Sequence, residues 1–155
     1  MTARLRAEDI PVGHTFDLGD AVTLTQAEIV AFANDWDPQD FHVDEHSPGA
    51  ARHGGVIASG IQTMALYMRL ASRVYNGWEI VAGRTIRDAE FLHPVYAGMR
   101  LHGRMTVERV EHYSPTRSNV THVGALVDED EREVLTLRLE AVVLRRDPGD
   151  EGGGR

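Results

Sequence analysis

The chain has 155 residues, of which 42% are hydrophobic and 26% charged, and this length and composition fit one globular domain with its own core. Its net charge is −8, which is a poor match to the phosphate neutralisation that drives nucleic-acid binding. The absence of cysteine excludes disulfides, thiolate catalysis and Cys-ligated metal centres. The first residues lack the apolar run of a signal peptide, and no stretch has the length of a membrane span, so we expect a cytoplasmic protein.

Two helices are predicted in the first half of the chain. Thr25 and Glu28 form a capping-box pattern, and the helix that begins there should end before Pro38, because a residue preceding proline avoids helical geometry. A second, longer helix is predicted from about Ser59 to Val74. Apolar residues at spacings of three and four should form its buried face, which Leu66 and Leu70 widen: Ile57, Ile61, Met64, Ala65, Met68 and Ala71.

The second half of the chain alternates between apolar and polar residues. This period of two predicts strands over about 99–107, 119–127 and 135–143, and a further strand is expected over about 85–92. Short turns between the strands favour an antiparallel meander. We therefore predict an α+β fold in which an antiparallel sheet wraps around the long helix, as a single domain over residues 1–146. The Gly-rich, polar residues 147–155 are expected to be a disordered tail.

Asp37 and His42 lie five residues apart in a loop closed by Pro38. A carboxylate beside an imidazole is an acid–base pair, because the imidazole titrates near neutrality and the carboxylate tunes its pKa and orientation. Such a pair can hold one water molecule and exchange its proton. The alternative is solvated surface, since Asp and His are common in loops that follow helices.

A glycine-rich segment, residues 54–60, precedes the long helix. The backbone N–H of Gly60 lies in the first turn, where it has no partner inside the helix and where the helix dipole favours negative charge. It could therefore hold the oxygen of a thioester carbonyl as that oxygen gains charge. The alternative is a plain glycine turn that lets the helix pack tightly.

Two other interpretations of the polar and apolar residues are weaker. His42 and His46 are four residues apart, which would suit zinc on a helix, but the local Pro and Gly content argues against one continuous helix, and we expect no metal site. Met64, Tyr67 and Met68 could line an acyl pocket, but a stripe of this kind is more typical of a core.

Three segments, in this order, resemble the MaoC-like dehydratases and (R)-specific enoyl-CoA hydratases over residues 8–145. The first contains Phe32-Ala33 and then Asp37-Pro38-Gln39-Asp40-Phe41-His42, similar to the family's Phe-Ala followed by Asp-x-Asn-Pro-x-His. The second is Gly54-Gly55-Val56-Ile57-Ala58-Ser59-Gly60, similar to Gly-Gly-x-Ile-Ala-His-Gly, and the third includes Pro94-Val95-Tyr96-Ala97-Gly98. The chain departs from the family pattern at three positions: Gln39 for Asn, Asp40 for Pro and Ser59 for His.

The resemblance implies a hot-dog fold and the hydration of a trans-2-enoyl-CoA to a 3-hydroxyacyl-CoA, or the reverse dehydration. Asp37 and His42 would activate the water, and one of them would return a proton to the α-carbon. The substrate would be bound by Gln39, Gly55, Ser59 and Gly60, with the Gly60 N–H on the thioester oxygen. No cofactor is implied, because coenzyme A arrives as part of the substrate. The family also implies a homodimer or higher homo-oligomer.

Two other functions remain open from the sequence. A hot-dog acyl-CoA thioesterase would share the fold, because function lies in the site. Such enzymes often carry their carboxylate on the long helix, and residues 61–73 contain no Asp or Glu. A non-catalytic acyl-CoA-binding subunit is the other alternative, and the presence of both Asp37 and His42 counts against it.

Overall fold

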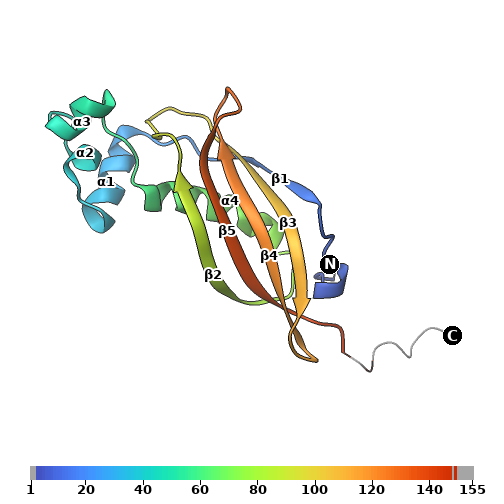
Figure 1. Ribbon diagram of the computed structural model, residues 1–155. Helices are drawn as coiled ribbons and strands as arrows, with labels where there is room; N and C mark the ends of the chain where they lie inside the picture. Colours follow the sequence, from blue (N-terminus) through green and yellow to red (C-terminus); the bar gives the residue numbers. More distant parts are fainter. Residues whose placement is uncertain (1–2, 148, 150–155) are drawn as a thin grey trace.

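The computed structural model describes residues 3–147 and residue 149, so the expected disordered tail lies almost entirely outside the described residues (Figure 1). Five antiparallel strands form one sheet in the order β1-β3-β4-β5-β2. The strands are β1 (Thr15–Asp20), β2 (Ile80–Phe91), β3 (His102–His112), β4 (Arg117–Val127) and β5 (Glu133–Leu144).

The helices divide between a small lobe and the face of the sheet (Figure 1). A 3-10 turn, η1 (Ala7–Asp9), comes first in the chain, and the lobe consists of α1 (Gln26–Trp36), α2 (Asp40–Val43) and α3 (Pro48–His53). The long helix α4 (Gly60–Tyr75) packs against the face of the sheet. No helix in the described part of the chain has the length and hydropathy needed to cross a membrane.

The predicted helix boundaries are confirmed. Thr25 Oγ1 accepts the Glu28 N–H at 3.2 Å and Glu28 Oε2 accepts the Thr25 N–H at 2.8 Å, which completes the capping box of α1. That helix ends at Trp36, two residues before Pro38. The N-cap of α4 is Ser59, whose hydroxyl accepts the Ile61 N–H at 3.2 Å.

The predicted strands are present, and their apolar positions face the core: Leu101, Gly103, Met105, Val107, Leu135, Leu137, Leu139, Ala141 and Val143. Strand β1 was not predicted. It is six residues long, and its alternation consists of only two apolar residues, Phe16 and Leu18, which is too short a run to indicate a strand. It is an edge strand that pairs only with β3.

The predicted buried face of α4 is confirmed only in part. Leu66, Leu70 and Ala71 are buried, as predicted, but Ile61 is 55% exposed, Ala65 is exposed, and Met64 and Met68 are half-buried. Gln62, Thr63 and Tyr67 complete the buried face. The exposed and the buried apolar residues form overlapping stripes on this helix. Because Gln62 and Thr63 are polar, the buried stripe is difficult to recognise in the sequence. Tyr67 fits the sheet only because position 124 is glycine: a Cβ there would lie 2.1 Å from Tyr67 Cζ.

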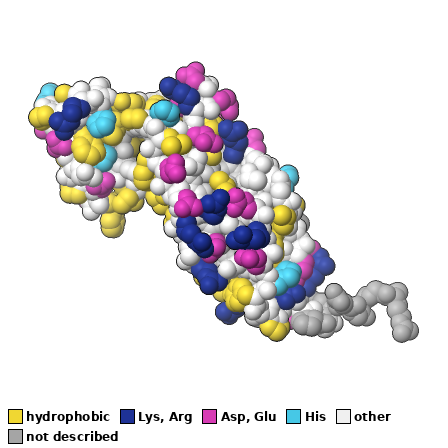
Figure 2. Space-filling model, viewed as in Figure 1, with side chains coloured by type: hydrophobic (Ala, Val, Ile, Leu, Met, Phe, Trp, Pro, Cys, Tyr) yellow, Lys and Arg dark blue, Asp and Glu magenta, His cyan; other side chains and the backbone are white. Residues whose placement is uncertain are grey.

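Exposed apolar side chains are concentrated on β2, the strand that follows α4 in the sequence. Val81 is 44% exposed, Ile86 52% and Phe91 53%. Figure 2 shows basic and acidic side chains gathered over the middle of the sheet, where Arg138 pairs with Glu108 and Asp88.

The two tryptophans occupy opposite environments. Trp36, the last residue of α1, is 71% exposed, whereas Trp78 is 2% exposed. Trp78 lies edge-on to Phe16, Tyr75 and His122 beneath the end of α4.

Candidate active site

A tight turn between α1 and α2 positions Asp37 and His42. Asp37 is the C-cap of α1, and its carbonyl accepts the Gln39 N–H at 2.8 Å. Gln39 is the N-cap of α2, and its carbonyl in turn accepts the His42 N–H at 2.9 Å. The turn brings His42 Nε2 to 3.4 Å from Asp37 Oδ2. The His42 side chain is 5% exposed and that of Asp37 22%, so the pair lies at the edge of the interior.

The other nitrogen of the His42 ring fixes its tautomer. Nδ1 lies 2.7 Å from the carbonyl oxygen of Ile57. A carbonyl can only accept a hydrogen bond, so Nδ1 carries the proton, and Nε2 of the neutral ring is an acceptor. When the ring is neutral, this unprotonated nitrogen faces the Asp37 carboxylate.

Both oxygens of Asp37 are held by neighbouring side chains. The Ser59 hydroxyl donates to Oδ2 at 2.7 Å, and the Gln39 amide donates to Oδ1 at 2.8 Å. The hydrogen bond from Ser59, followed by that from Gln39, lowers the pKa of Asp37 below its ordinary value. Asp37 is therefore a carboxylate at neutral pH.

With a neutral His42 ring, the pair presents two acceptors, Asp37 Oδ2 and His42 Nε2, 3.4 Å apart. Two acceptors cannot satisfy each other, but one water molecule has two donors and can bind both. The chemistry available here is the binding of a water molecule between two bases.

Backbone hydrogen bonds join the three sequence segments into one assembly. The Ile57 N–H donates to the Phe41 carbonyl at 3.1 Å, which links the second segment to the first. The Ala58 N–H donates to the Val95 carbonyl at 2.8 Å, and Ile57 forms an antiparallel bridge with Tyr96, which links the second to the third. The motifs therefore meet in space as well as in order.

The two glycines predicted to bind the substrate, Gly55 and Gly60, differ in their surroundings and in the use of their backbone N–H groups. Gly60 is the first residue of α4, and the Phe91 ring lies directly on it: a Cβ would come within 2.8 Å of the ring. Gly55 has φ +147° and donates its N–H to the Ala50 carbonyl at 2.9 Å, so this group is already used by the turn after α3.

Asp40, one of the departures from the family pattern, lies against α3. Its carboxylate accepts the Phe41 N–H at 2.8 Å and occupies the space beside Gly49, where a Cβ would lie 2.6 Å from Oδ1. Over residues 3–147, no three His, Asp or Glu side chains are grouped so that they could hold a metal ion.

The sequence interpretation missed two contributors to the site. The Ile57 carbonyl orients His42, and the Phe91 ring covers the start of α4. A backbone carbonyl has no signature in a sequence, and the contact between Phe91 and Gly60 joins residues far apart in the chain.

Comparison with known proteins identifies the family. The model of the MaoC like domain matches residues 8–129. The uncharacterized protein YdeM of Bacillus subtilis is 30% identical over 142 residues, covering 90% of this chain and 98% of that protein. The 3-hydroxyacyl-thioester dehydratase Z of Mycobacterium tuberculosis is 32% identical over 102 residues, covering 64% of this chain and 68% of that protein.

A solved structure agrees over nearly the whole chain. The MaoC-like dehydratase from Rhodospirillum rubrum has a TM-score of 0.77 and 32% sequence identity, covering 92% of this chain and 98% of that one. The protein has the α+β hot-dog fold, as predicted. The chain belongs to the MaoC-like dehydratase family, which includes hydratases and dehydratases of acyl thioesters.

Proposed function

We propose that the protein hydrates the double bond of a trans-2-enoyl-CoA to give a 3-hydroxyacyl-CoA, or catalyses the reverse dehydration. The observation that carries this proposal is the pair of acceptors, Asp37 Oδ2 and His42 Nε2, which face each other at 3.4 Å. A hydratase needs such a pair, because its second substrate is a water molecule that must be held and deprotonated.

The proposed reaction adds one water across one double bond. The water is bound between Asp37 and His42, and one of these bases takes a proton as the oxygen attacks the β-carbon. The proton is then delivered to the α-carbon, so no other reactant is needed. Charge gathers on the thioester oxygen meanwhile, and the Gly60 N–H at the start of α4 stabilises it.

Ser59 and Gln39 act in this proposal by positioning the base. Together they hold both oxygens of Asp37, so the carboxylate is oriented before the substrate arrives. The dehydratase Z of Mycobacterium tuberculosis and the MaoC-like dehydratase of Rhodospirillum rubrum support the hydro-lyase class by their names. No metal or redox cofactor takes part, and coenzyme A enters as part of the substrate.

We also propose that the protein is a homodimer formed along β2. This strand is at the edge of the sheet, is 12 residues long and carries Val81, Ile86 and Phe91 exposed. A long apolar edge strand favours pairing with another strand. A second copy of β2 would pair with its free backbone N–H and C=O groups and cover its apolar side chains.

The proposed activity is tested by the loss of enoyl absorbance when an enoyl-CoA is added to the purified protein. We expect Asp37→Asn and His42→Ala each to lower the rate by about 10²- to 10⁴-fold, the range for general acid–base groups. Asp35→Asn is the matched control, because Asp35 is an exposed residue of α1. Unchanged rates in the two site variants would contradict the roles, and release of free thiol would indicate a thioesterase.

A further inference from the structure

The connecting segment between α3 and α4, residues 53–57, carries the carbonyl group that orients His42. The Ile57 carbonyl oxygen lies 2.7 Å from Nδ1 of that ring. Two residues of the segment are glycines with positive φ: Gly54 at +75° and Gly55 at +147°. Glycine has no Cβ, so a segment of this kind can adopt many backbone conformations. The position of the Ile57 carbonyl therefore depends on contacts from outside the connecting segment.

One half-buried residue, Tyr96, contacts both ends of the connecting segment. Its hydroxyl donates to the carbonyl oxygen of His53, the last residue of α3, at 2.5 Å. Its backbone forms the antiparallel bridge with Ile57. Tyr96 thus makes one contact before the two glycines and one contact after them, and it holds the segment from both ends.

Tyr96 is itself held by the turn that follows it. Its N–H donates to the sulfur of Met99 at 3.1 Å, and its carbonyl accepts the Met99 N–H at 3.3 Å. Gly98, with φ +82°, permits this turn and donates its N–H to the Leu24 carbonyl at 2.9 Å. The third sequence segment, which includes residues 94–98, therefore supports the Tyr96 side chain from a fixed backbone.

A stack of rings forms a different connection between α3 and His42. The rings of Phe41 and His42 meet edge to face, with their centroids 4.4 Å apart. The His53 ring also lies against that of Phe41, with centroids 5.5 Å apart. This packing does not involve the Tyr96 hydroxyl, so the two connections can be separated by substitution.

From these contacts we propose that Tyr96 is a positioning residue: by holding the connecting segment, its hydroxyl keeps the Ile57 carbonyl on Nδ1 and leaves Nε2 of His42 free to take a proton. The inference rests on the proposed function, because that function requires a base at Nε2. In a neutral histidine, the nitrogen that carries the proton is set by the hydrogen bond that the other nitrogen makes. A displaced Ile57 carbonyl would let some molecules carry the proton on Nε2, where the ring cannot act as this base.

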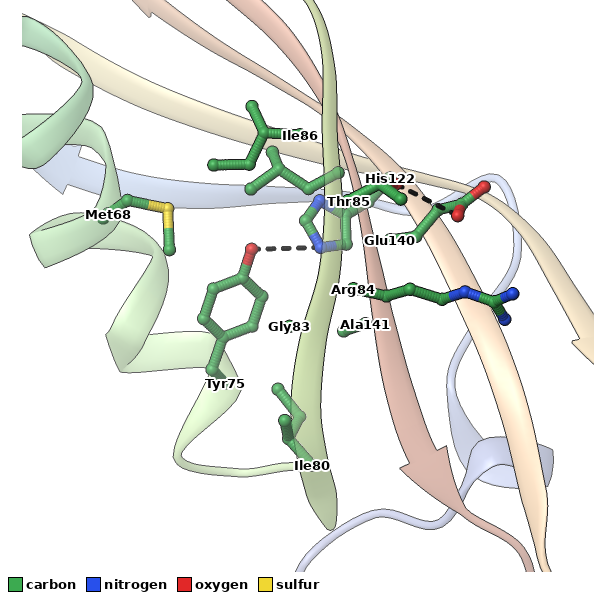
Figure 3. Close-up of a pocket in the computed structure, with 11 residues that line it drawn as sticks. Met68, Tyr75, Ile80, Gly83, Arg84, Thr85, Ile86, His122, Glu140 and Ala141 are labelled. Carbon is green, nitrogen blue, oxygen red and sulfur yellow. Dashed lines mark hydrogen bonds between the residues drawn. The ribbon is translucent and has the colours of Figure 1, made fainter. Parts of the chain in front are cut away.

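A second buried histidine, His122, provides an internal reference for a measurement of proton position. Figure 3 shows the Tyr75 hydroxyl directed at its ring, 3.0 Å from Nε2. Burial lowers the pKa of His122 to about 4, so this ring is neutral above pH 7. Tyr75 is the last residue of α4, whereas the connecting segment precedes the first, so a change at Tyr96 should leave His122 unaffected.

Tyr96→Phe removes the hydroxyl and keeps the ring, so it tests the contact with the His53 carbonyl. Nitrogen NMR of protein labelled in its histidines distinguishes a protonated ring nitrogen from an unprotonated one. The measurement is made at about pH 8.5, above the ordinary pKa of histidine. We expect the share of His42 that carries its proton on Nδ1 to fall and the His122 signals to stay in place. His42→Ala identifies the His42 signals by their loss.

Turnover of trans-2-butenoyl-CoA supplies a second readout. We expect kcat of Tyr96→Phe to fall about tenfold, less than for His42→Ala, because the base remains but is correctly protonated in fewer molecules. KM should change less than about twofold, since the Tyr96 hydroxyl is bonded to the His53 carbonyl and is not offered to the substrate. Tyr113→Phe is the matched control, because Tyr113 is 51% exposed and follows β3, outside the candidate site.

His53→Ala separates the hydrogen bond from the ring packing. It keeps the His53 carbonyl, and so the bond to Tyr96, but it removes the ring that lies against Phe41. We expect the proton of His42 to stay on Nδ1 in this variant. A shift as large as that in Tyr96→Phe would mean that ring packing holds His42, and it would overturn the role of the Tyr96 hydroxyl.

An unchanged proton position on His42 in a Tyr96→Phe protein whose thermal melt matches the wild type would also overturn the proposal. A shifted proton with an unchanged kcat would overturn it as well, because the position of Nδ1–H would then not matter for turnover. A variant that no longer folds would assign the hydroxyl to the stability of the whole chain and contradict a role confined to the site.

The proton position is measured without substrate, so it separates this proposal from the proposed function. The expected shift on His42, together with no hydration by the wild type, would support the positioning role and contradict the hydratase. Hydration by the wild type, with no shift in Tyr96→Phe, would contradict the positioning role alone.

Discussion

Ser59 occupies a position where the resembling family commonly has histidine, and it uses its hydroxyl twice. The hydroxyl oxygen accepts the Ile61 N–H at 3.2 Å as the N-cap of α4, and the hydroxyl O–H donates to Asp37 Oδ2 at 2.7 Å. One short side chain thus ties the start of the helix to the proposed base. Residues distant in sequence are fixed to each other before any ligand binds.

Removal of this hydroxyl should change the acid side of the pH profile. Ser59 is the largest contributor to the lowered pKa of Asp37, so Ser59→Ala should raise that pKa. The carboxylate would then be protonated at higher pH, and the acid limb of kcat/KM should move to higher pH. Ser59→Thr keeps the hydroxyl and serves as control. An acid limb that stays in place in Ser59→Ala would show that Asp37 does not set it.

At this scale, local sequence patterns predicted much of the candidate site. Asp37, Gln39 and His42 lie within one turn, and their spacing in sequence already brings them together. The direction of His42 could not be predicted, because it depends on the Ile57 carbonyl. Likewise, nothing in the local sequence indicates that Phe91 covers Gly60.

The helix α4 and the sheet make close contacts that depend on glycine at particular positions of the strands. Tyr67 of α4 lies over Gly124 of β4, and Leu70 lies over Gly103 of β3, where a Cβ would approach to 2.7 Å. These two glycines allow the helix to approach the sheet closely. The sequence predicted both elements and the burial of Tyr67 and Leu70, but it did not predict which glycines of the sheet these side chains contact.

The prediction for the buried face of α4 was partly wrong, because it included exposed residues and left out two buried polar ones. A buried helix face usually contains apolar residues, yet this one contains Gln62 and Thr63. The competing stripe of Ile61, Met64 and Met68 is more apolar and less buried. Amphipathic periodicity cannot distinguish a face that packs on a sheet from one that awaits a ligand or a partner. The capping box of α1, by contrast, depends only on neighbouring residues and was predicted correctly.

The contact between α4 and β4 can be tested by adding one methyl group. Gly124→Ala would place a Cβ 2.1 Å from Tyr67 Cζ, and Tyr67 is fully buried, so something must shift. We expect the free energy of unfolding to fall by about 1–3 kcal/mol, measured by urea titration. Gly83→Ala is the control: no heavy atom lies within 4 Å of its Cβ, and its effect should be within about 0.5 kcal/mol. Equal effects of the two substitutions would contradict this packing.

The edge strand β1 is joined to β3 by an ionic contact as well as by its ladder. His102 Nε2 lies 2.8 Å from Asp17 Oδ1, and Nδ1 lies 2.8 Å from Asp20 Oδ1. The hydrogen bond to Asp20, assisted by the charge of Asp17, raises the pKa of His102. The protonated ring is therefore the form that the folded state favours.

The sign of the resulting pH dependence follows from linkage. A raised pKa stabilises the fold fully below the unfolded value, about 6.5 for histidine, and the contribution is lost as pH rises through the folded value. We expect His102→Gln to destabilise the protein more at about pH 5.5 than at about pH 9, by urea titration. The same loss at both pH values would mean that the charge of His102 does not contribute.

The sheet of the whole molecule has two edge strands of unequal length, β1 and β2. Strand β1 has six residues and a bulge between Asp17 and Gly19, whereas β2 has 12 residues and exposed apolar side chains. A short, irregular edge strand disfavours pairing with a strand of another chain, whereas a long apolar edge strand favours such pairing. The architecture of one chain could be predicted from its sequence, but the asymmetry of its edges could not, because β1 was not predicted.

The proposed dimer can be tested at the edge of β2. Val81 is 44% exposed and lies near the start of the strand, so Val81→Glu should place a charge in the apolar contact between the two copies. Sedimentation should give the wild type twice the chain mass of 17.2 kDa and shift the variant toward one chain mass. Val22→Glu, at a position 45% exposed between β1 and α1, should leave the mass unchanged. A wild type that sediments as one chain would contradict the dimer.

The contrast between Trp36 and Trp78 equips the protein with two intrinsic fluorophores in separate places. Trp36 is 71% exposed and directly precedes Asp37, so we expect its emission to be red-shifted and open to collisional quenchers. Trp78 is 2% exposed and contacts the rings of Tyr75 and His122, so we expect its emission to be blue-shifted and shielded. A Trp36→Phe or Trp78→Phe variant then leaves one reporter, either beside the candidate active site or beneath the end of α4, without any added label.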